Sequence, residues 1–122
     1  MLPIYANSLQ LENRTIFLAS EPVDFRMSID GLSRFIQNKN NTQLYDGSIY
    51  VFYNRHQDKI KCLYWDLNGF VLYYKRLDKC KFRFRKMLNS MESISATELD
   101  IILSGFDPND VQRIPATLEH QP

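Results

Sequence analysis

Three strand-like segments follow one another closely in the middle of the chain, and they constrain the fold more than any other feature. Both connections between them are short enough for hairpins, and the second contains Asn68-Gly69, two residues that tolerate positive φ. Consecutive strands joined by hairpins are antiparallel. The sequence therefore predicts an antiparallel meander built from residues 48–53, 59–65 and 70–76.

Two amphipathic helices are predicted outside this meander. The first follows the Ser20-Glu21-Pro22 break and starts near Ser28, where apolar residues recur at spacings of three and four. Its apolar stripe consists of Ile29, Leu32, Phe35 and Ile36. The second helix begins at Ser95-Ala96-Thr97-Glu98, which has capping-box spacing, and ends at Gly105. Its stripe consists of Leu99, Ile102, Leu103 and Phe106.

Two further strands are indicated by shorter patterns. Residues 14–19 have strand-like composition, and residues 81–85 alternate between cations and phenylalanines. Because successive side chains of a strand point to opposite faces, the second pattern predicts a strand with one cationic face and one aromatic face.

These elements predict one α+β domain. The chain has 122 residues, of which 44% are hydrophobic, and this is enough for one compact core. We expect an antiparallel β-meander of four or five strands with both amphipathic helices packed on one face. The domain is expected to span residues 1–108, and the polar residues 109–122 are expected to form a flexible C-terminal tail.

A strong positive charge is hidden in a chain whose overall net charge is only +1. Residues 51–90 contain ten Lys and Arg against three Asp, a net charge of plus seven, so the remainder of the chain is acidic. Tyrosine, tryptophan and phenylalanine residues are interleaved with these cations. Such a mixture favours contact with the phosphates and bases of nucleic acid.

Several short motifs resemble those of a known protein family over about residues 14–106. They are Val23-Asp24-Phe25-Arg26, Ile29-Asp30-Gly31-Leu32, Ile49-Tyr50-Val51-Phe52, Asp58-Lys59-Ile60-Lys61, Leu63-Tyr64-Trp65-Asp66 and Tyr74-Lys75-Arg76-Leu77. The chain thereby resembles the accessory protein encoded by the second open reading frame of bacterial insertion sequences of family sixty-six, often called transposase accessory protein B. The resemblance implies a role in transposition beside a separate, larger transposase that carries the catalytic chemistry.

The residues expected to bind nucleic acid or a partner protein are Arg26, Arg55, Lys59, Lys61, Trp65, Lys75, Arg76, Lys81, Arg83 and Arg85. Three of them, Lys81, Arg83 and Arg85, would lie about 7 Å apart on one strand face, near the spacing of successive phosphates. Each assignment has a structural alternative. Strand cations can serve solubility, Arg26 can form a local ion pair with Asp24, and Trp65 can belong to the core.

The favoured function is a non-catalytic accessory factor that contacts DNA at the ends of the mobile element. The alternative is an adaptor that docks the transposase of the same element without binding DNA. A third hypothesis, a metal-dependent nuclease that uses Asp24, Asp30 and Asp66, has weaker support, because no pattern brings these carboxylates together.

No cofactor or metal site is expected from the sequence. The two cysteines, Cys62 and Cys80, are too far apart for a CxxC motif and are expected to be reduced. The sequence shows no membrane-spanning run and no export signal, so we expect a cytoplasmic protein. It does not determine the oligomeric state.

Overall fold

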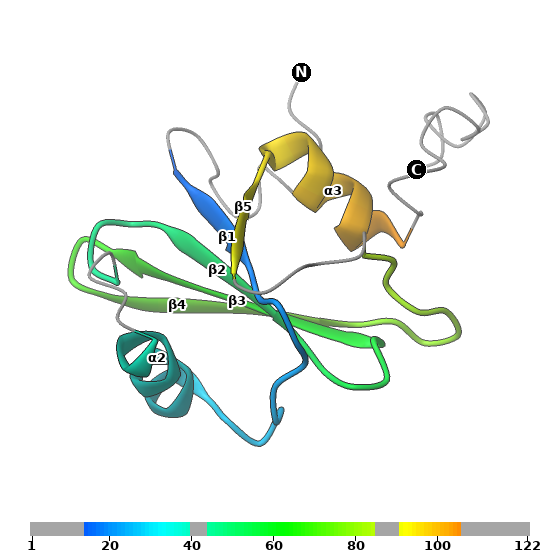
Figure 1. Ribbon diagram of the computed structural model, residues 1–122, viewed down its shortest axis with the longest axis horizontal. Helices are drawn as coiled ribbons and strands as arrows, with labels where there is room; N and C mark the ends of the chain where they lie inside the picture. The colour runs from blue at the N-terminus through cyan, green and yellow to red at the C-terminus, as the bar shows by residue number, and fades with distance from the viewer. Residues whose placement is uncertain (1–13, 40–43, 85–90, 106–122) are drawn as a thin grey trace.

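A five-stranded mixed sheet organises the described part of the chain, with one helix on each side of it (Figure 1). The computed structural model describes residues 14–39, 44–84 and 91–105. In chain order the elements are β1 (Ile16–Leu18), α2 (Ile29–Asn38), β2 (Ile49–Tyr53), β3 (Lys59–Asp66), β4 (Gly69–Arg76), β5 (Glu92–Ile94) and α3 (Ala96–Ser104). The order of the strands across the sheet is β4-β3-β2-β1-β5.

The predicted meander is confirmed for its three central strands, but the sheet as a whole is not a meander. Strands β2, β3 and β4 are antiparallel neighbours, as expected. In contrast, β1 lies parallel to β2, with Ile16 opposite Ile49, because the chain crosses over through α2 between them. Strand β5, which was not predicted, pairs with β1 in antiparallel orientation. The prediction of a purely antiparallel sheet was therefore wrong.

The tight turn between β3 and β4 uses a different residue from the one expected. Asp66 and Gly69 form the last pair of the ladder, so Leu67 and Asn68 make the turn. Leu67 has a φ of 50° and its side chain is exposed, whereas neither Asn68 nor Gly69 has a positive φ. The hairpin is confirmed, but its left-handed position is occupied by Leu67.

Both helices form where the sequence indicated, but they contact opposite faces of the sheet. The Phe35 ring of α2 lies edge-to-face on Phe52 of β2, with 5.9 Å between ring centroids. The Nζ of Lys75 in β4 donates to the carbonyl of Leu103 in α3 at 2.8 Å. Phe52 is paired with Lys61 and Lys61 with Tyr74, so the adjacent Lys75 points to the other face. Packing of both helices on one face is not confirmed (Figure 1).

The ends of α3 follow the local signals in the sequence. The hydroxyl of Ser95 accepts a hydrogen bond from the backbone N–H of Glu98 at 3.0 Å, which is the expected cap. Gly105 closes the helix with a φ of 87°, a left-handed conformation that glycine adopts without steric cost. Leu99, Ile102 and Leu103 are buried, and Phe106 lies outside the described residues.

Strand β2 lies at the centre of the core. All five of its residues are buried, including Tyr50 and Phe52 on the side of α2 and Ile49 and Val51 on the other side. A strand that is buried on both faces needs cover on both faces. The placement of α2 and α3 on opposite sides of the sheet meets this requirement.

The predicted fourth strand at residues 81–85 is not present in its described part. Residues 81–84 form no ladder with any strand, and one backbone hydrogen bond joins Phe82 N–H to the carbonyl of Gln57. Lys81 and Arg83 are exposed and Phe82 is buried, so the alternation of the side chains is as expected. The last residue of this predicted strand, Arg85, lies outside the described residues. The same holds for the predicted domain boundary at residue 108 and for the predicted tail. No helix within those residues is long and apolar enough to cross a membrane.

Candidate nucleic-acid interface

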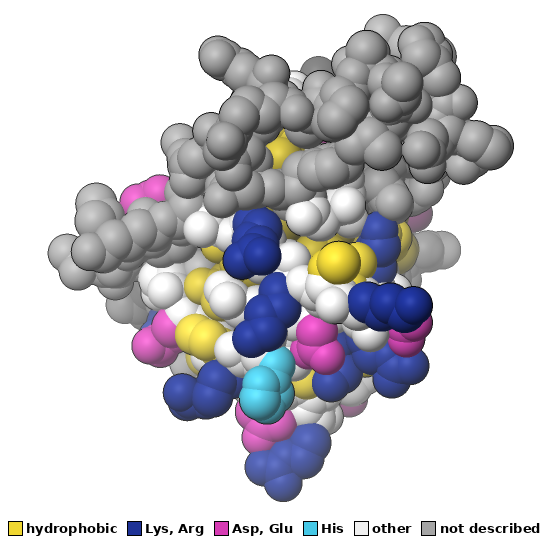
Figure 2. All heavy atoms as spheres, turned by 90° about the vertical axis from the view of Figure 1, so that its right-hand side faces the viewer, with side chains coloured by type: hydrophobic (Ala, Val, Ile, Leu, Met, Phe, Trp, Pro, Cys, Tyr) yellow, Lys and Arg dark blue, Asp and Glu magenta, His cyan; other side chains and the backbone are white. Residues whose placement is uncertain are grey.

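Two segments that are distant in sequence meet at one end of the sheet and bring cations together. The turn between β2 and β3 is joined to the segment after β4 by two backbone hydrogen bonds, from Leu77 N–H to Asp58 O at 2.8 Å and from Phe82 N–H to Gln57 O at 2.6 Å. We call this surface the cationic end; its Lys and Arg residues are Arg55, Lys59, Arg76, Lys79, Lys81 and Arg83. Figure 2 shows Lys and Arg side chains gathered on this side of the molecule. Only Asp58 and Asp78 oppose them within the two segments.

The segment after β4 is held in place by its phenylalanines. Phe82 is 1% exposed, and the Phe84 ring stacks on Tyr53 with 4.3 Å between centroids. These contacts fix the backbone on either side of Lys81 and Arg83, whose side chains are exposed. The two cations are therefore presented from an anchored segment although it is not a strand.

The β2–β3 turn is stabilised by the side chain of Asn54. Its Oδ1 accepts hydrogen bonds from the backbone N–H groups of Asp58 and Lys59 at 3.1 and 3.0 Å, and its Nδ2 donates to Asp58 Oδ1 at 2.6 Å. The Asn54 hydrogen bond lowers the pKa of the Asp58 carboxyl group. At the tip of this ordered turn, Arg55 and His56 are exposed.

Lys61 and Lys75, two of the predicted binding residues, instead donate to backbone carbonyls. Lys61 is 8% exposed, and its Nζ donates to Phe25 O at 3.0 Å and Met27 O at 2.6 Å. Burial lowers the pKa of Lys61, and the nearby Asp24 opposes this shift. Lys75 donates to Leu103 O, as described above. The two ammonium groups lie on opposite faces of the sheet, so the strand cations do not share one face.

Arg26 and Trp65, the remaining described candidates, lie outside the cationic end as defined. Arg26 is in the loop before α2, where its guanidinium binds the Asp24 carboxylate, with Nη2 2.7 Å from Oδ2. Trp65 is at the other end of β3, where its ring makes edge-to-face contacts with Tyr45 and Phe70 at centroid distances of 5.1 and 5.0 Å. The Arg26–Asp24 pair is the local ion pair considered as the structural alternative for Arg26. Trp65 is only partly buried and does not belong to the described core cluster, so the core alternative is not confirmed for it.

Replacement of Arg26 by glutamine is expected to raise the pKa of Asp24. That pKa lies at about 2 instead of the ordinary 3.8, chiefly because Arg26 side-chain N–H groups donate to the carboxylate. The folded-state value is depressed, so the stabilisation by this pair is present above the unfolded pKa and is lost as the pH falls through about 2. An NMR titration of the Asp24 carboxyl carbon measures the shift, with Arg34→Gln as the control. A value that stays near 2 in Arg26→Gln would contradict the assignment.

The carboxylates considered for a nuclease site have separate partners. Asp24 binds Arg26, and Asp66 lies 3.7 Å from Arg14. Asp30 is exposed in the first turn of α2. Within residues 14–39, 44–84 and 91–105, no three His, Cys, Asp or Glu side chains are grouped so that they could hold a metal ion.

Two members of the cationic end were not among the predicted binding residues. Lys79 is exposed between Arg76 and Lys81, and His56 follows Arg55 at the tip of the turn. The local charge excess already included Lys79, whereas no sequence signal distinguished His56. Of the two cysteines, Cys62 is buried and Cys80 is exposed among these cations, and both are free thiols.

Comparison with known proteins identifies one matching family and two relatives. Residues 14–113 match the family described as IS66 Orf2 like protein. The uncharacterized protein y4jC of Sinorhizobium fredii is 33% identical over 100 residues, which cover 82% of this chain and 86% of that protein. The uncharacterized protein y4hO of the same organism is 28% identical over 96 residues, or 79% and 84% of the two chains. No solved structure matches the chain.

Proposed function

The chain belongs to the IS66 Orf2-like family, which implies an accessory role in transposition, and we propose that it fulfils this role by contacting DNA through its cationic end. DNA cleavage would be carried out by the separate transposase of the element. Terminal DNA of the element is the proposed nucleic-acid partner.

One observation carries this proposal: six Lys and Arg residues lie on, or directly beside, two anchored segments that are joined by backbone hydrogen bonds. Neutralisation of phosphates by Lys and Arg releases condensed counterions, and this release drives sequence-independent DNA binding. Anchoring lowers the entropy that such a surface loses on binding. The arrangement suits contacts with the DNA backbone, which position a protein without reading sequence.

The cationic end is tested by a double charge reversal, Lys81→Glu with Arg83→Glu. We expect this variant to bind a labelled duplex of the terminal repeat at least about tenfold more weakly, with a salt slope that is smaller by roughly two, because about one counterion is released per phosphate contact. Fluorescence anisotropy at several salt concentrations measures both quantities. A scrambled duplex reports whether binding depends on sequence.

The matched control is Arg34→Glu with Lys39→Glu, which changes the net charge equally at exposed positions of the α2 region. It should retain nearly the wild-type affinity. Equal weakening by both pairs of substitutions would show a general effect of charge and would contradict the proposed surface. Failure of the wild-type protein to bind either duplex would contradict DNA contact itself.

The adaptor alternative has support at the other end of the sheet. Tyr45 is 57% exposed and Leu67 is 92% exposed, and Tyr45 contacts the rings of Trp65 and Phe70. Exposed aromatic and apolar side chains of this kind are enriched at protein interfaces. Binding of purified transposase that is lost in Tyr45→Ser with Leu67→Ser, without any binding of DNA, would favour this alternative.

A further inference from the structure

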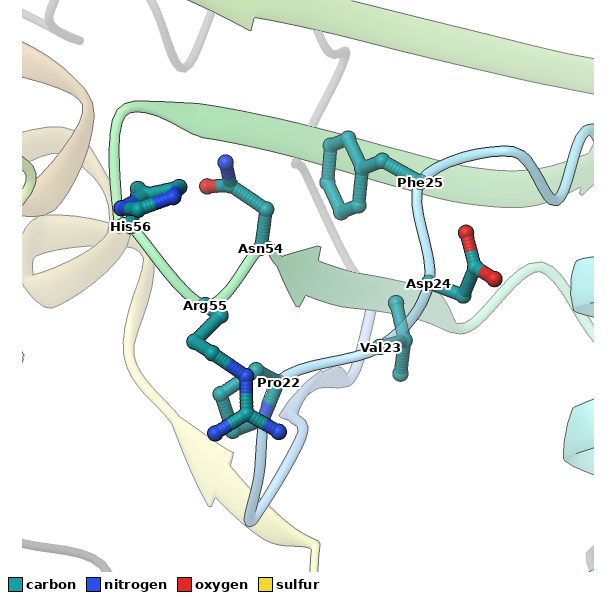
Figure 3. A pocket seen from close by; sticks show the side chains of 7 residues that line it. All are labelled: Pro22, Val23, Asp24, Phe25, Asn54, Arg55 and His56. Atoms are coloured by element: carbon teal, nitrogen blue, oxygen red, sulfur yellow. The ribbon is translucent and has the colours of Figure 1, made fainter.

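A pocket of about 360 Å³ adjoins the cationic end. It lies between the loop that leads to α2 and the turn between β2 and β3, and its lining residues are Pro22, Val23, Asp24, Phe25, Asn54, Arg55 and His56 (Figure 3). Arg55 belongs both to this pocket and to the cationic end. The pocket therefore opens where the proposed DNA surface begins.

Both walls of the pocket are held by bonds that require no ligand. Val23 N–H donates to Tyr53 O at 3.0 Å, and Lys61 donates to the carbonyls of Phe25 and Met27. The opposite wall is fixed by Asn54, which binds the backbone of its own turn. The pocket is thus preformed, which lowers the conformational entropy lost on binding.

The chemistry of the lining combines the Phe25 ring with one guanidinium group, that of Arg55. Phe25 is partly buried, and its orientation is fixed by the Lys61 ammonium group 4.8 Å from its centroid and by Tyr74 at 6.2 Å. Pro22 and Val23 add apolar surface, and Arg55 and His56 are exposed at the rim. The one carboxylate, Asp24, is already neutralised by Arg26. An aromatic ring beside a cation suits a nucleotide, because the ring can stack on the flat base and the cation can bind the phosphate.

We propose that this pocket receives one unstacked base of single-stranded DNA, with Phe25 as the stacking surface and Arg55 at the adjacent phosphate. The inference rests on the proposed function, because it requires DNA at the cationic end. It goes beyond backbone contact, since it assigns the protein a preference for DNA with unpaired bases. The volume of the pocket is ample for a single base and lies within the range of small-ligand sites.

The test uses the full chain and a single-stranded oligonucleotide that contains 2-aminopurine, whose emission falls when it stacks on an aromatic ring. Saturating wild-type protein should lower this emission. Phe25→Leu should leave the emission high and weaken binding by roughly 5- to 150-fold, the range given by loss of one base–aromatic stack. Phe25→Tyr, which keeps a ring, should behave as wild type, as should the control Tyr45→Leu at the other end of the sheet.

The outcomes separate this inference from the proposed function. If DNA binds and Lys81→Glu with Arg83→Glu abolishes binding, but wild-type protein leaves the emission unchanged, the pocket assignment is overturned and the cationic end stands. Equal effects of Phe25→Leu and Tyr45→Leu would also overturn it. If neither single-stranded nor duplex DNA binds, both the DNA contact of the cationic end and the base-binding pocket are refuted. Should Phe25→Leu fail to fold, the wild-type and Phe25→Tyr emissions alone decide.

Discussion

Replacement of Phe82 by alanine is expected to lower the free energy of unfolding by about 3 to 5 kcal/mol, the usual loss for a buried phenylalanine. Phe82 is 1% exposed, and its segment has no strand ladder to hold it in place. The buried ring and the hydrogen bond to Gln57 attach this segment to the turn, so Lys81 and Arg83 should lose their fixed position as well. Urea denaturation measures the stability, and DNA affinity is measured on the fraction that remains folded.

Phe84→Ala is the matched control for this experiment. Phe84 is only partly buried, although it stacks on Tyr53, so its removal should cost less than the removal of Phe82. A loss below about 1 kcal/mol for Phe82→Ala would be far under the range for a buried ring and would show that the segment does not depend on this contact.

Replacement of Lys61 by methionine is expected to lower the free energy of unfolding by about 2 to 4 kcal/mol, since a hydrogen bond from a charged donor is worth roughly 1.5 to 3 kcal/mol and this ammonium group makes two. Methionine keeps most of the apolar stem and removes the charged donor. The loop at residues 25–27 should then open, which can be measured as faster amide hydrogen exchange of Phe25 and Met27.

Lys59→Met provides the comparison, because Lys59 lies on the same strand and face but is more exposed and its nearest carboxylate, Asp58, is 3.9 Å away. This change should cost less than about 1 kcal/mol, the usual range for an ion pair that solvent can reach. If Lys61→Met retained wild-type stability and lost DNA binding, Lys61 would act at the surface and its structural role would be refuted.

The features that sequence alone predicted well are those specified by neighbouring residues. The capping box at Ser95 and Glu98 and the left-handed Gly105 set the bounds of α3 with residues inside or beside the helix. The short β3–β4 connection likewise joins strands that are adjacent in sequence. Local patterns of this kind specify an element without information about its distant neighbours.

The features that were missed depend on contacts between distant segments. Nothing near Ile16 indicates that it pairs with both Ile49 and Ile94, so neither the parallel pair nor β5 was predicted. The alternation at residues 81–84 correctly indicated which side chains point inward, but the same alternation arises in a segment that has no strand partner.

In the candidate site, too, the features that neighbouring residues specify were predicted and those that depend on distant segments were missed. A charge count along the chain located the region of the cationic end, because both of its segments lie within residues 51–90. It could not separate Lys61 from Lys81, since the carbonyls that bind Lys61 belong to Phe25 and Met27 on another segment. The pocket beside Phe25 was missed for this reason too, because its two walls come from separate parts of the chain.

The position of β1 between β2 and β5 also keeps the edge of β2 paired. These two neighbours come from later parts of the chain, and β1 and β5 have only three residues each. Loss of β5 would leave one side of β1 with unpaired N–H and C=O groups, and loss of β1 would expose β2 in the same way. An unpaired strand edge can recruit strands from other molecules. Residues 16–18 and 92–94 thus cover the edge of the buried strand β2, and the outer strands of the sheet are β4 and β5.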